Sequence, residues 1–477
     1  MEFKLIKNID KYLANNFPRL GINKKREVKR LLFEIAKRDN LKIEDIACLC
    51  GKDALRQMDK KILSFKQIKT FLLKNRYPTV YKCHEKNIFY LPALNILKEL
   101  EFKPSKFKYE PRYIYIEKKS LHSELAEKIG KLFPSAKFEP IENIKNHIKE
   151  HKYTLKDYSL RHENLFVINE NYDFFKKCPC AKSVVRCGYY VLNLGFGCPF
   201  ECSYCFLQEY QNFSGIALPS NIDDFLNNLA VKLTLPPAYA PRGVSNDTQA
   251  SGRVKSFKGL WRIGSGEFSD SLALDNISDY SKKIVPFFAK YPNAYFEFKT
   301  KSSEIKNLLN IKPAKNIIVS WSVNPQKIAD LNEFYSASLA ERINSAKQCA
   351  DAGYGIGFHF DPIIYYKGWE KDYQQIVELI FSKISRDKIH WISLGTLRFN
   401  PELKKIIENR FPSSKILDEE LIIDFGGKMR YPDYLRTDIY LKMTKFLQQA
   451  DFEKEKIYLC MENSNTWNKV GLNLNKN

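Results

Sequence analysis

Three cysteines stand within eight residues, in a spacing that suits a metal cluster. Cys198, Cys202 and Cys205 form the pattern C-x3-C-x2-C in the stretch 194–208. Cysteine thiolates are the residues that hold iron–sulfur clusters. Three ligands for four irons would leave one iron open, much as a catalytic zinc keeps a free position. The spacing therefore predicts a [4Fe-4S] cluster whose open iron binds a small molecule.

The loop resembles the cluster loop of the radical S-adenosylmethionine (SAM) enzymes, a resemblance strengthened by Tyr204 and Phe206 around the last cysteine. It implies a [4Fe-4S] cluster and S-adenosyl-L-methionine as cofactors. The residues alone leave two alternatives open, a zinc site without its fourth ligand and three unrelated core cysteines.

A second group of cysteines precedes this loop. Cys178-Pro-Cys180 and Cys187 could hold an auxiliary cluster or a zinc with a remote fourth ligand. Ordinary thiols near the main site are the favoured interpretation. Cys48 and Cys50, within an apolar helix-like run, are expected to be buried thiols.

Strand-like and helical segments alternate from residue 187 onward, which predicts an α/β fold with a parallel sheet. The expected strands are 188–194, 260–264, 295–299, 316–323, 354–360 and 390–397. Ser338 and Glu341 form a capping pair that should open a helix over 338–352. Six such units match the partial (β/α)6 barrel of radical SAM enzymes. In parallel barrels chemistry lies at the C-terminal strand ends, and the cysteine loop directly follows the first strand.

Four regions are expected along the chain. They are a basic helical N-terminal region (1–105), a small α/β unit (106–185), the barrel (186–400) and a C-terminal extension (401–477). Ser64 and Gln67 should cap one N-terminal helix. This region could contact DNA, although a packing appendage is the favoured interpretation. The Pro- and Ser-rich stretch 236–256 is expected to be an inserted loop.

The chain is strongly basic, with 77 Lys and Arg against 55 Asp and Glu. A net charge of +22 suits a polyanionic partner, because basic side chains neutralise phosphates. A lysine-rich genome would also produce such a surface. No apolar run is long enough to span a membrane, and the first residues do not resemble a secretory signal. A reducing cytoplasm is therefore expected, with the cysteines as metal ligands rather than disulfides.

From about residue 111 onward the chain resembles the spore photoproduct lyase family, radical SAM enzymes that repair a thymine dimer in DNA. The resemblance rests on stretches in the family's order. They are RIGSGEFSD (262–270), FKTK (298–301), VSWSVN (319–324), GFHFDP (357–362), WISLGTLRF (391–399), GKMRY (427–431) and YLCME (458–462).

This resemblance implies a SAM pocket at the strand ends. Ser269, Lys301 and Ser322 would hold the methionyl part of SAM, and Glu267 would face its ammonium group. Hydroxyls and a cation suit a zwitterionic amino acid. Turn-forming serines and a solvated lysine are the alternatives. An electron from the cluster would cleave SAM, and the resulting 5′-deoxyadenosyl radical would take a substrate hydrogen.

Two departures from the family concern the return of that hydrogen. The family's hydrogen-donor cysteine is matched here by Glu267, and a carboxylate cannot donate a hydrogen atom to a carbon radical. A family tyrosine is replaced by Phe206, whereas Tyr204 is kept. Glu267 and Tyr204 are the candidate catalytic residues. Cys349 and Cys460 could replace the missing thiol only if the fold brings them to the pocket.

DNA would present its lesion flipped out of the base stack. Arg430 and Tyr431 match the family's residues that wedge into the duplex, although an ordinary strand-end pair is equally expected. His359 and Asp361 could line the pocket, or His359 could be a core residue.

The first hypothesis is a spore photoproduct lyase-like enzyme acting on DNA, reduced by a flavodoxin- or ferredoxin-type donor. The second keeps the radical SAM scaffold with an RNA, peptide or small-molecule substrate, because the donor cysteine is missing. The third is a non-catalytic nucleic-acid-binding iron–sulfur protein.

Overall fold

The structure is a computed structural model that describes residues 2–49, 64–82, 88–150, 153–171, 174–181, 183–234 and 260–472. The expected loop 236–256, Cys50 and the side chain of Cys48 lie outside the described part. The chain forms two compact units. The smaller comprises Met1–Lys103 with Arg398–Leu435, and the larger Pro104–Leu397 with Arg436–Asn477. The four expected regions divide the chain differently, and their boundaries stay a prediction.

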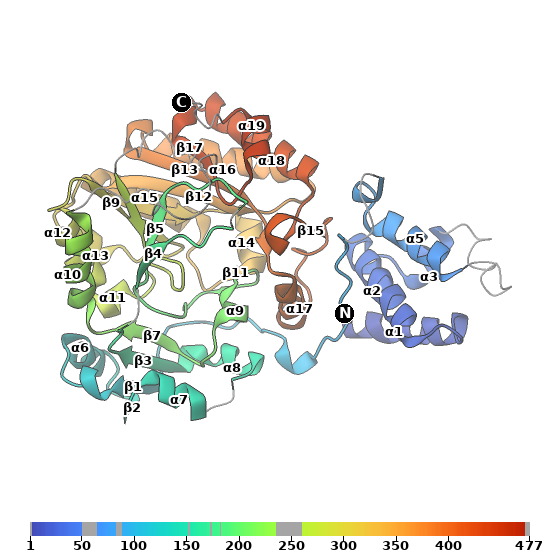
Figure 1. Cartoon of the computed structure of the whole chain (residues 1–477), viewed down its shortest axis with the longest axis horizontal. Coiled ribbons are helices and arrows are strands. Elements are labelled where there is room, and N and C mark those ends of the chain that lie inside the picture. Colours follow the sequence, from blue (N-terminus) through green and yellow to red (C-terminus); the bar gives the residue numbers. More distant parts are fainter. Residues whose placement is uncertain are drawn as a thin grey trace, which may run out of the picture. The chain divides into compact units, whose positions relative to one another are not determined.

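The larger unit is built on a curved eight-stranded sheet in the order β17-β13-β12-β10-β9-β8-β5-β4 (Figure 1). All neighbouring strands are parallel except the pair β4–β5. The strands are β4 (Phe175–Lys177), β5 (Tyr189–Leu192), β8 (Trp261–Gly264), β9 (Ala294–Thr300), β10 (Ile317–Ser322), β12 (Gly355–Ile363), β13 (Ile389–Thr396) and β17 (Ile457–Leu459). This sheet confirms the expected α/β fold, and all six expected barrel strands are present.

Helices connect these strands. They are α9 (Leu207–Tyr210), α10 (Ile222–Leu233), α11 (Asp275–Ser278), α12 (Tyr280–Phe288), α13 (Lys306–Leu309), α14 (Gln326–Asn332), α15 (Leu339–Ala352), α16 (Trp369–Lys383), α18 (Asp433–Gln449) and α19 (Ser464–Val470). The predicted cap of α15 is present, since Ser338 accepts a hydrogen bond from the backbone N–H of Glu341 and Glu341 reciprocates. All six residues of β10 are buried, as expected for a parallel strand covered on both faces.

A second, four-stranded parallel sheet in the larger unit has the order β2-β1-β3-β7. Its strands are β1 (Tyr113–Glu117), β2 (Lys137–Ile141), β3 (Asn164–Ile168) and β7 (Ile216–Pro219), with helices α6 (Glu124–Leu132), α7 (Ile144–Glu150) and α8 (Leu155–Ser159). Strands β1, β2 and β3 fall within residues 106–185, where a small α/β unit is expected. Strand β7 comes from beyond the cysteine loop, so the chain crosses from the main sheet to the small one and back.

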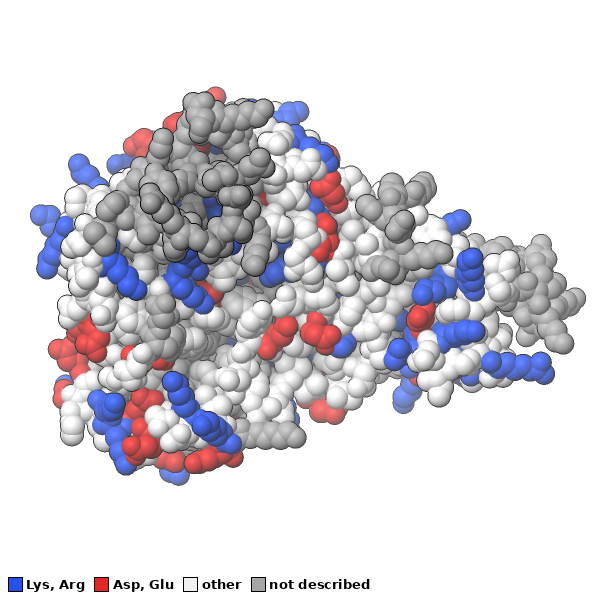
Figure 2. Space-filling view, viewed as in Figure 1, with Lys and Arg blue, Asp and Glu red and all other residues white. Residues whose placement is uncertain are grey.

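The smaller unit is mainly helical. It contains α1 (Glu2–Asn16), α2 (Ile22–Asp39), α3 (Ile43–Leu49), α5 (Phe65–Arg76) and α17 (Pro401–Arg410), with a small sheet of β14 (Arg398–Phe399), β16 (Met429–Arg430) and β15 (Ile422–Ile423). Ser64 caps α5 with Gln67 as predicted. Figure 2 shows lysine and arginine side chains gathered over the N-terminal helices, where Lys4, Lys7, Lys11 and Lys24 are exposed.

A buried group of charges links α2, α5 and α17 inside this unit. Glu34 accepts hydrogen bonds from Arg76 (2.8 Å) and Lys404 (2.7 Å). Arg30 pairs with Glu408 at 2.5 Å. Burial alone would raise the pKa of Glu34, but the charges of Lys404, Arg76 and Arg30 outweigh it and lower the pKa to about 2.

Candidate functional site

The cysteine loop leaves the C-terminal end of β5 and is anchored by a short strand pair. Strand β6 (Glu201–Cys202) pairs antiparallel with β11 (Glu333–Phe334), which sets Cys202 opposite Glu333. Cys202 is buried, whereas Cys198 and Cys205 are half-buried. Burial raises the pKa of Cys202 to about 12 in the absence of a bound metal.

A buried arginine from the small α/β region fixes the path of this loop. Arg161 is fully buried. Its guanidinium donates to the loop backbone and to one carboxylate, at Cys198 O (3.1 Å), Phe200 O (2.7 Å) and Glu201 Oε2 (2.8 Å). The planar guanidinium can meet several acceptors at once, which an ammonium group does less well.

A second side chain also holds the loop. The Gln208 amide donates to Cys202 O (3.1 Å), Ser203 O (3.0 Å) and Cys205 O (3.3 Å). Polar contacts from Arg161 and Gln208 therefore hold the three thiols in place before any cofactor binds.

Lys301, one of the predicted SAM ligands, ends beside this loop. It follows β9, and its Nζ lies 3.7 Å from Cys202 Sγ and 3.0 Å from Tyr204 Oη. Burial would lower the pKa of Lys301, but the neighbouring Cys202 and Glu333 raise it well above its ordinary value. The structure thus brings together three residues that the sequence assigned to one site.

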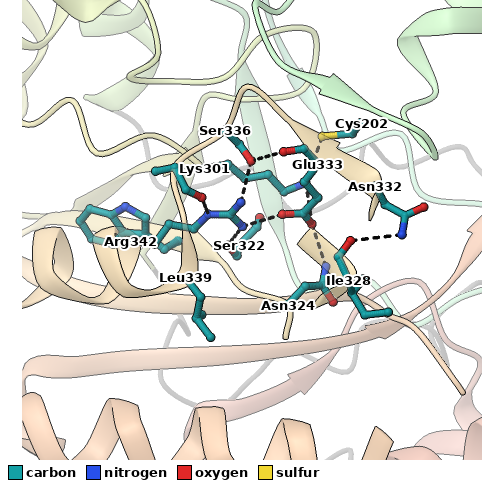
Figure 3. A network of polar contacts seen from close by, with 12 residues as sticks. Cys202, Lys301, Ser322, Asn324, Ile328, Asn332, Glu333, Ser336, Leu339 and Arg342 are labelled. Atoms are coloured by element: carbon teal, nitrogen blue, oxygen red, sulfur yellow. Dashed lines mark hydrogen bonds and ion pairs between the residues drawn. The ribbon is translucent and has the colours of Figure 1, made fainter. Parts of the chain in front are cut away.

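Glu333 is the centre of a buried network that sequence reasoning missed (Figure 3). Its Oε1 accepts hydrogen bonds from Tyr204 Oη and, at 2.8 Å, from Asn324 Nδ2. Its Oε2 lies 2.7 Å from Arg342 Nη1, and Lys301 Nζ is 3.6 Å from Oε1. Burial alone would raise the pKa of Glu333, but Lys301 and Arg342 lower it to about 2. Glu333 is therefore an ionised carboxylate that fixes Lys301.

The loop after β8 lies against the start of the cysteine loop. Gly197 N donates to Phe268 O at 2.9 Å. A Cβ atom on Gly195 would stand 3.9 Å from Ser269 Oγ and only 2.9 Å from Ala217 O, so only glycine allows this approach. Ser269 is half-buried there. Asp270 joins this loop to β9 by accepting hydrogen bonds from Thr300 Oγ1 (2.6 Å) and Lys301 N (2.7 Å).

Ser322 lies at the C-terminal end of β10 and is 5% exposed. Its backbone oxygen accepts a hydrogen bond from Arg342 Nη1 at 2.9 Å, so the ion partner of Glu333 also fixes this strand end. The predicted role of its hydroxyl toward SAM stays a prediction.

Glu267 also follows β8, where its carboxylate forms an ion pair with Lys176 of β4 at 3.0 Å. The side chain of Glu267 is 13% exposed. Lys176 Nζ also lies 4.7 Å from the ring centre of Phe268. The position expected to match the family's donor cysteine thus holds a charged pair. Cys349, one possible replacement, is buried in α15.

Of the remaining predicted residues, Arg430, Tyr431 and His359 are buried and Asp361 is half-buried. Arg430 and Tyr431 are both fully buried, and the Arg430 guanidinium lies 4.1 Å from the ring centre of Phe425. Their duplex-wedging role stays a prediction, and it would require their exposure. His359 is a core residue, since its ring nitrogens contact Ser393 Oγ (2.6 Å) and Glu297 Oε1 (2.7 Å).

The donor set of the loop fits an iron–sulfur cluster. Each thiolate of a cluster binds its own iron, so the sulfurs need not converge on one ion. Within the described residues, no three metal-binding side chains converge in that way. The fixed loop and the cation beside Cys202 suit a negatively charged thiolate. Cys198, Cys202 and Cys205 would therefore be the cluster ligands.

Comparison with known proteins supports the expected family. Residues 259–458 match the family model described as spore photoproduct lyase. The spore photoproduct lyase of Clostridium acetobutylicum is 25% identical over 248 residues, which cover 52% of this chain and 68% of that protein. That of Bacillus subtilis is 24% identical over 324 residues, covering 65% and 85%. The chain is thus similar to spore photoproduct lyases over the residues that these matches cover.

Solved structures agree on the fold. A spore photoproduct lyase complexed with dinucleoside spore photoproduct matches 74% of this chain and 99% of its own, with a TM-score of 0.59 and 20% identity. A double mutant of that enzyme, with AdoMet and the same lesion bound, matches 75% and 100% with the same TM-score and identity. These comparisons support the expected family, and they confirm the expected fold class and enzyme class, a radical SAM lyase. No described helix is long and apolar enough to cross a membrane.

Proposed function

We propose that the chain is a radical SAM enzyme that cleaves SAM at a cluster held by Cys198, Cys202 and Cys205. The observation that carries this proposal is the position of Lys301, whose ammonium group lies beside Cys202 Sγ and Tyr204 Oη at the strand ends. A structural metal site has no need of a fixed cation next to one of its thiolates. The AdoMet bound in a solved relative supports SAM as the ligand.

A reduced cluster at this loop would supply the electron that splits SAM. The protein's own residues would bind and orient SAM. Lys301 provides a cation for the SAM carboxylate, and Ser269 and Ser322 provide hydroxyls at neighbouring strand ends. Glu333 fixes Lys301 in place, so the cation is oriented before SAM arrives.

For the substrate, we propose a DNA lesion of the spore photoproduct type. The names of the relatives and the lesion bound in solved relatives support this choice. The net charge of +22 suits a polyanion. A flavodoxin- or ferredoxin-type protein would supply the electron.

The second candidate is a radical SAM enzyme on this scaffold with another substrate. The Glu267–Lys176 ion pair favours it, because a charged pair stands where the family's hydrogen donor is expected. Such an enzyme would not need the family's cysteine at this position. Another donor would return the hydrogen to the substrate radical, or the radical would react in another way.

One experiment tests both candidates. The protein is reconstituted anaerobically with iron and sulfide, reduced, and given SAM with and without DNA that contains spore photoproduct. Release of 5′-deoxyadenosine with recovery of thymine supports the first candidate. Release without thymine recovery supports the second. Absence of release under both conditions contradicts the radical SAM proposal itself.

Matched cysteine variants identify the cluster ligands. Cys202→Ala should abolish 5′-deoxyadenosine release, because it removes one of three cluster ligands. Cys349→Ala removes another buried thiol, far along the chain in α15, and should leave the release unchanged. Full activity of Cys202→Ala would show that the cluster is held elsewhere.

A further inference from the structure

Four cysteines outside the SAM loop gather where the two edges of the main sheet approach each other. Strands β4 and β17 are the edge strands of this sheet. Cys178 directly follows β4, and Cys460 directly follows β17. The two edges are joined by a hydrogen bond from Val185 N to Glu462 O at 2.8 Å. Residues almost 300 positions apart in the chain therefore lie close together.

The sulfur atoms show the grouping most directly. Cys178 Sγ and Cys180 Sγ are 3.4 Å apart, on either side of Pro179. Cys178 N donates to Tyr189 O at 2.9 Å, which brings Cys178 to the segment that carries Cys187, two residues before Tyr189. The cysteines thus lie on neighbouring segments of the chain.

Arg262 links the segments that carry two of these cysteines. Its guanidinium lies 5.1 Å from the ring centre of Tyr189, two residues after Cys187. It also donates a 2.8 Å hydrogen bond to Tyr458 Oη, two residues before Cys460. Cysteines brought together from distant segments can supply thiolates to one thiophilic centre.

We propose that Cys178, Cys180, Cys187 and Cys460 form a second metal site, which binds a thiophilic centre through four thiolates. Thiolate ligands select zinc or an iron–sulfur cluster over hard cations. Loading forms four metal–sulfur bonds and releases the thiol protons to solvent, with no change of oxidation state at sulfur. A full set of four protein ligands leaves no open position, so no substrate binds at the centre. It joins the two edges of the half-barrel.

Two thiolates on one tetrahedral zinc, each bound at about 2.3 Å, stand about 3.8 Å apart. The 3.4 Å between Cys178 Sγ and Cys180 Sγ is close to this distance. Cys178 and Cys180, the pair in contact, would hold neighbouring positions on the centre.

The test removes the SAM cluster first, so that it does not depend on SAM cleavage. In the full chain, Cys198, Cys202 and Cys205 are all changed to Ala, and the protein is reconstituted anaerobically in separate arms with iron plus sulfide and with zinc. We expect this variant to retain one metal centre per chain in one of the two arms. Adding Cys180→Ser and Cys460→Ser should remove it, whereas adding Cys349→Ser should not.

A second measurement covers the case in which the multiple variants do not fold. In the unaltered protein, alkylation followed by mass mapping should find Cys178, Cys180, Cys187 and Cys460 protected after loading and reactive after chelation. Metal removal should also lower the melting temperature by several degrees. The proposal is overturned if the triple-Ala variant folds and holds neither metal, or if loading leaves the reactivity of these four thiols unchanged.

Discussion

At the residue scale, the site depends on Glu333, a carboxylate that lies outside the motifs of the sequence. Glu333 is buried with two cations, Lys301 and Arg342, and with the hydroxyl of Tyr204. Three elements that are distant in sequence therefore share one negative charge. The orientation of Lys301, the proposed partner of the SAM carboxylate, depends on this charge.

Replacing that carboxylate should be costly. Glu333→Gln keeps the size of the side chain but leaves Lys301 and Arg342 buried without their anion, so we expect a loss of about 3–5 kcal/mol in the free energy of unfolding. Urea denaturation followed by circular dichroism measures it. Glu455→Gln, at an exposed carboxylate, is the control and should change stability by less than about 0.5 kcal/mol. Equal stability of the two variants would contradict the proposed importance of this network.

A variant of Arg430 can distinguish a structural role of this side chain from a role in DNA binding. Because its guanidinium is buried and lies over Phe425, we expect Arg430→Ala to lower the stability of the smaller unit by about 2 kcal/mol. DNA affinity, measured on the folded fraction by fluorescence anisotropy, should remain unchanged. Unchanged stability with a loss of lesion-containing DNA binding would instead support the duplex-wedging role.

At the element scale, the cysteine loop is irregular backbone made rigid by side chains from other elements. Arg161 makes hydrogen bonds to two loop carbonyls and to Glu201. Gln208, at the start of α9, makes three more, to Cys202 O, Ser203 O and Cys205 O. The geometry of the three thiols is therefore set by residues that bind no metal.

Arg161→Lys keeps the charge but cannot reach both Cys198 O and Phe200 O, so the loop should lose its fixed shape. We expect clearly less iron and sulfide per chain after anaerobic reconstitution, measured by colorimetric analysis. Arg112→Lys, at a side chain 73% exposed, is the matched control and should load normally. Normal loading of Arg161→Lys would show that the loop does not need this anchor.

The buried charges between α2, α5 and α17 make the smaller unit sensitive to acid. The folded-state pKa of Glu34, about 2, lies below its ordinary value of 4.5. The contribution of Glu34 to the free energy of unfolding is therefore fully present above about pH 4.5, and it is lost as the pH falls toward 2. The shift corresponds to about 3 kcal/mol. Acid titration followed by circular dichroism should show this loss, and Glu34→Gln, although less stable at neutral pH, should show a smaller dependence on pH.

The elements could be predicted because their signals are local. A capping box occupies only four residues, and it predicts the start of a helix at Ser338 with Glu341 and at Ser64 with Gln67. Apolar runs in the same way predict the buried strands. The cysteine triad is local too. Glu333 and Arg342 could not be predicted, because their importance arises only when β11 pairs with β6. Cys460 becomes a partner of Cys178 for the same reason, since the sheet brings its two edges together.

At the scale of the whole molecule, the positive charge is unevenly distributed. Residues 1–103 carry 24 Lys and Arg against 12 Asp and Glu, which is about half of the net charge of +22. Exposed lysines of α1 and α2 contribute to the basic face in Figure 2. If DNA is the substrate, this face should add affinity without sequence preference.

Changing Lys4, Lys7 and Lys11 together to Glu should therefore weaken DNA binding. A plot of the logarithm of affinity against the logarithm of salt concentration should also have a shallower slope. The slope should change by roughly one unit for each phosphate that the variant no longer neutralises. Anisotropy titrations at several salt concentrations measure both effects. The matched control changes Lys388, Lys454 and Lys456 of the larger unit to Glu. An equal loss of affinity in both variants would show that DNA binding depends on the net charge of the protein and not on the position of these lysines.

The pairing of β6 with β11 also orders events during synthesis of the chain. Tyr204 and Glu333 are separated by 129 residues, so the cysteine loop leaves the ribosome long before its carboxylate partner exists. At about 5–20 residues per second this delay is roughly 6 to 26 seconds. During that interval the three thiols have Arg161 but not Glu333. Cluster insertion into a correctly shaped loop is thus expected only after β11 has been made, and a chain truncated before residue 333 should lose its cluster readily.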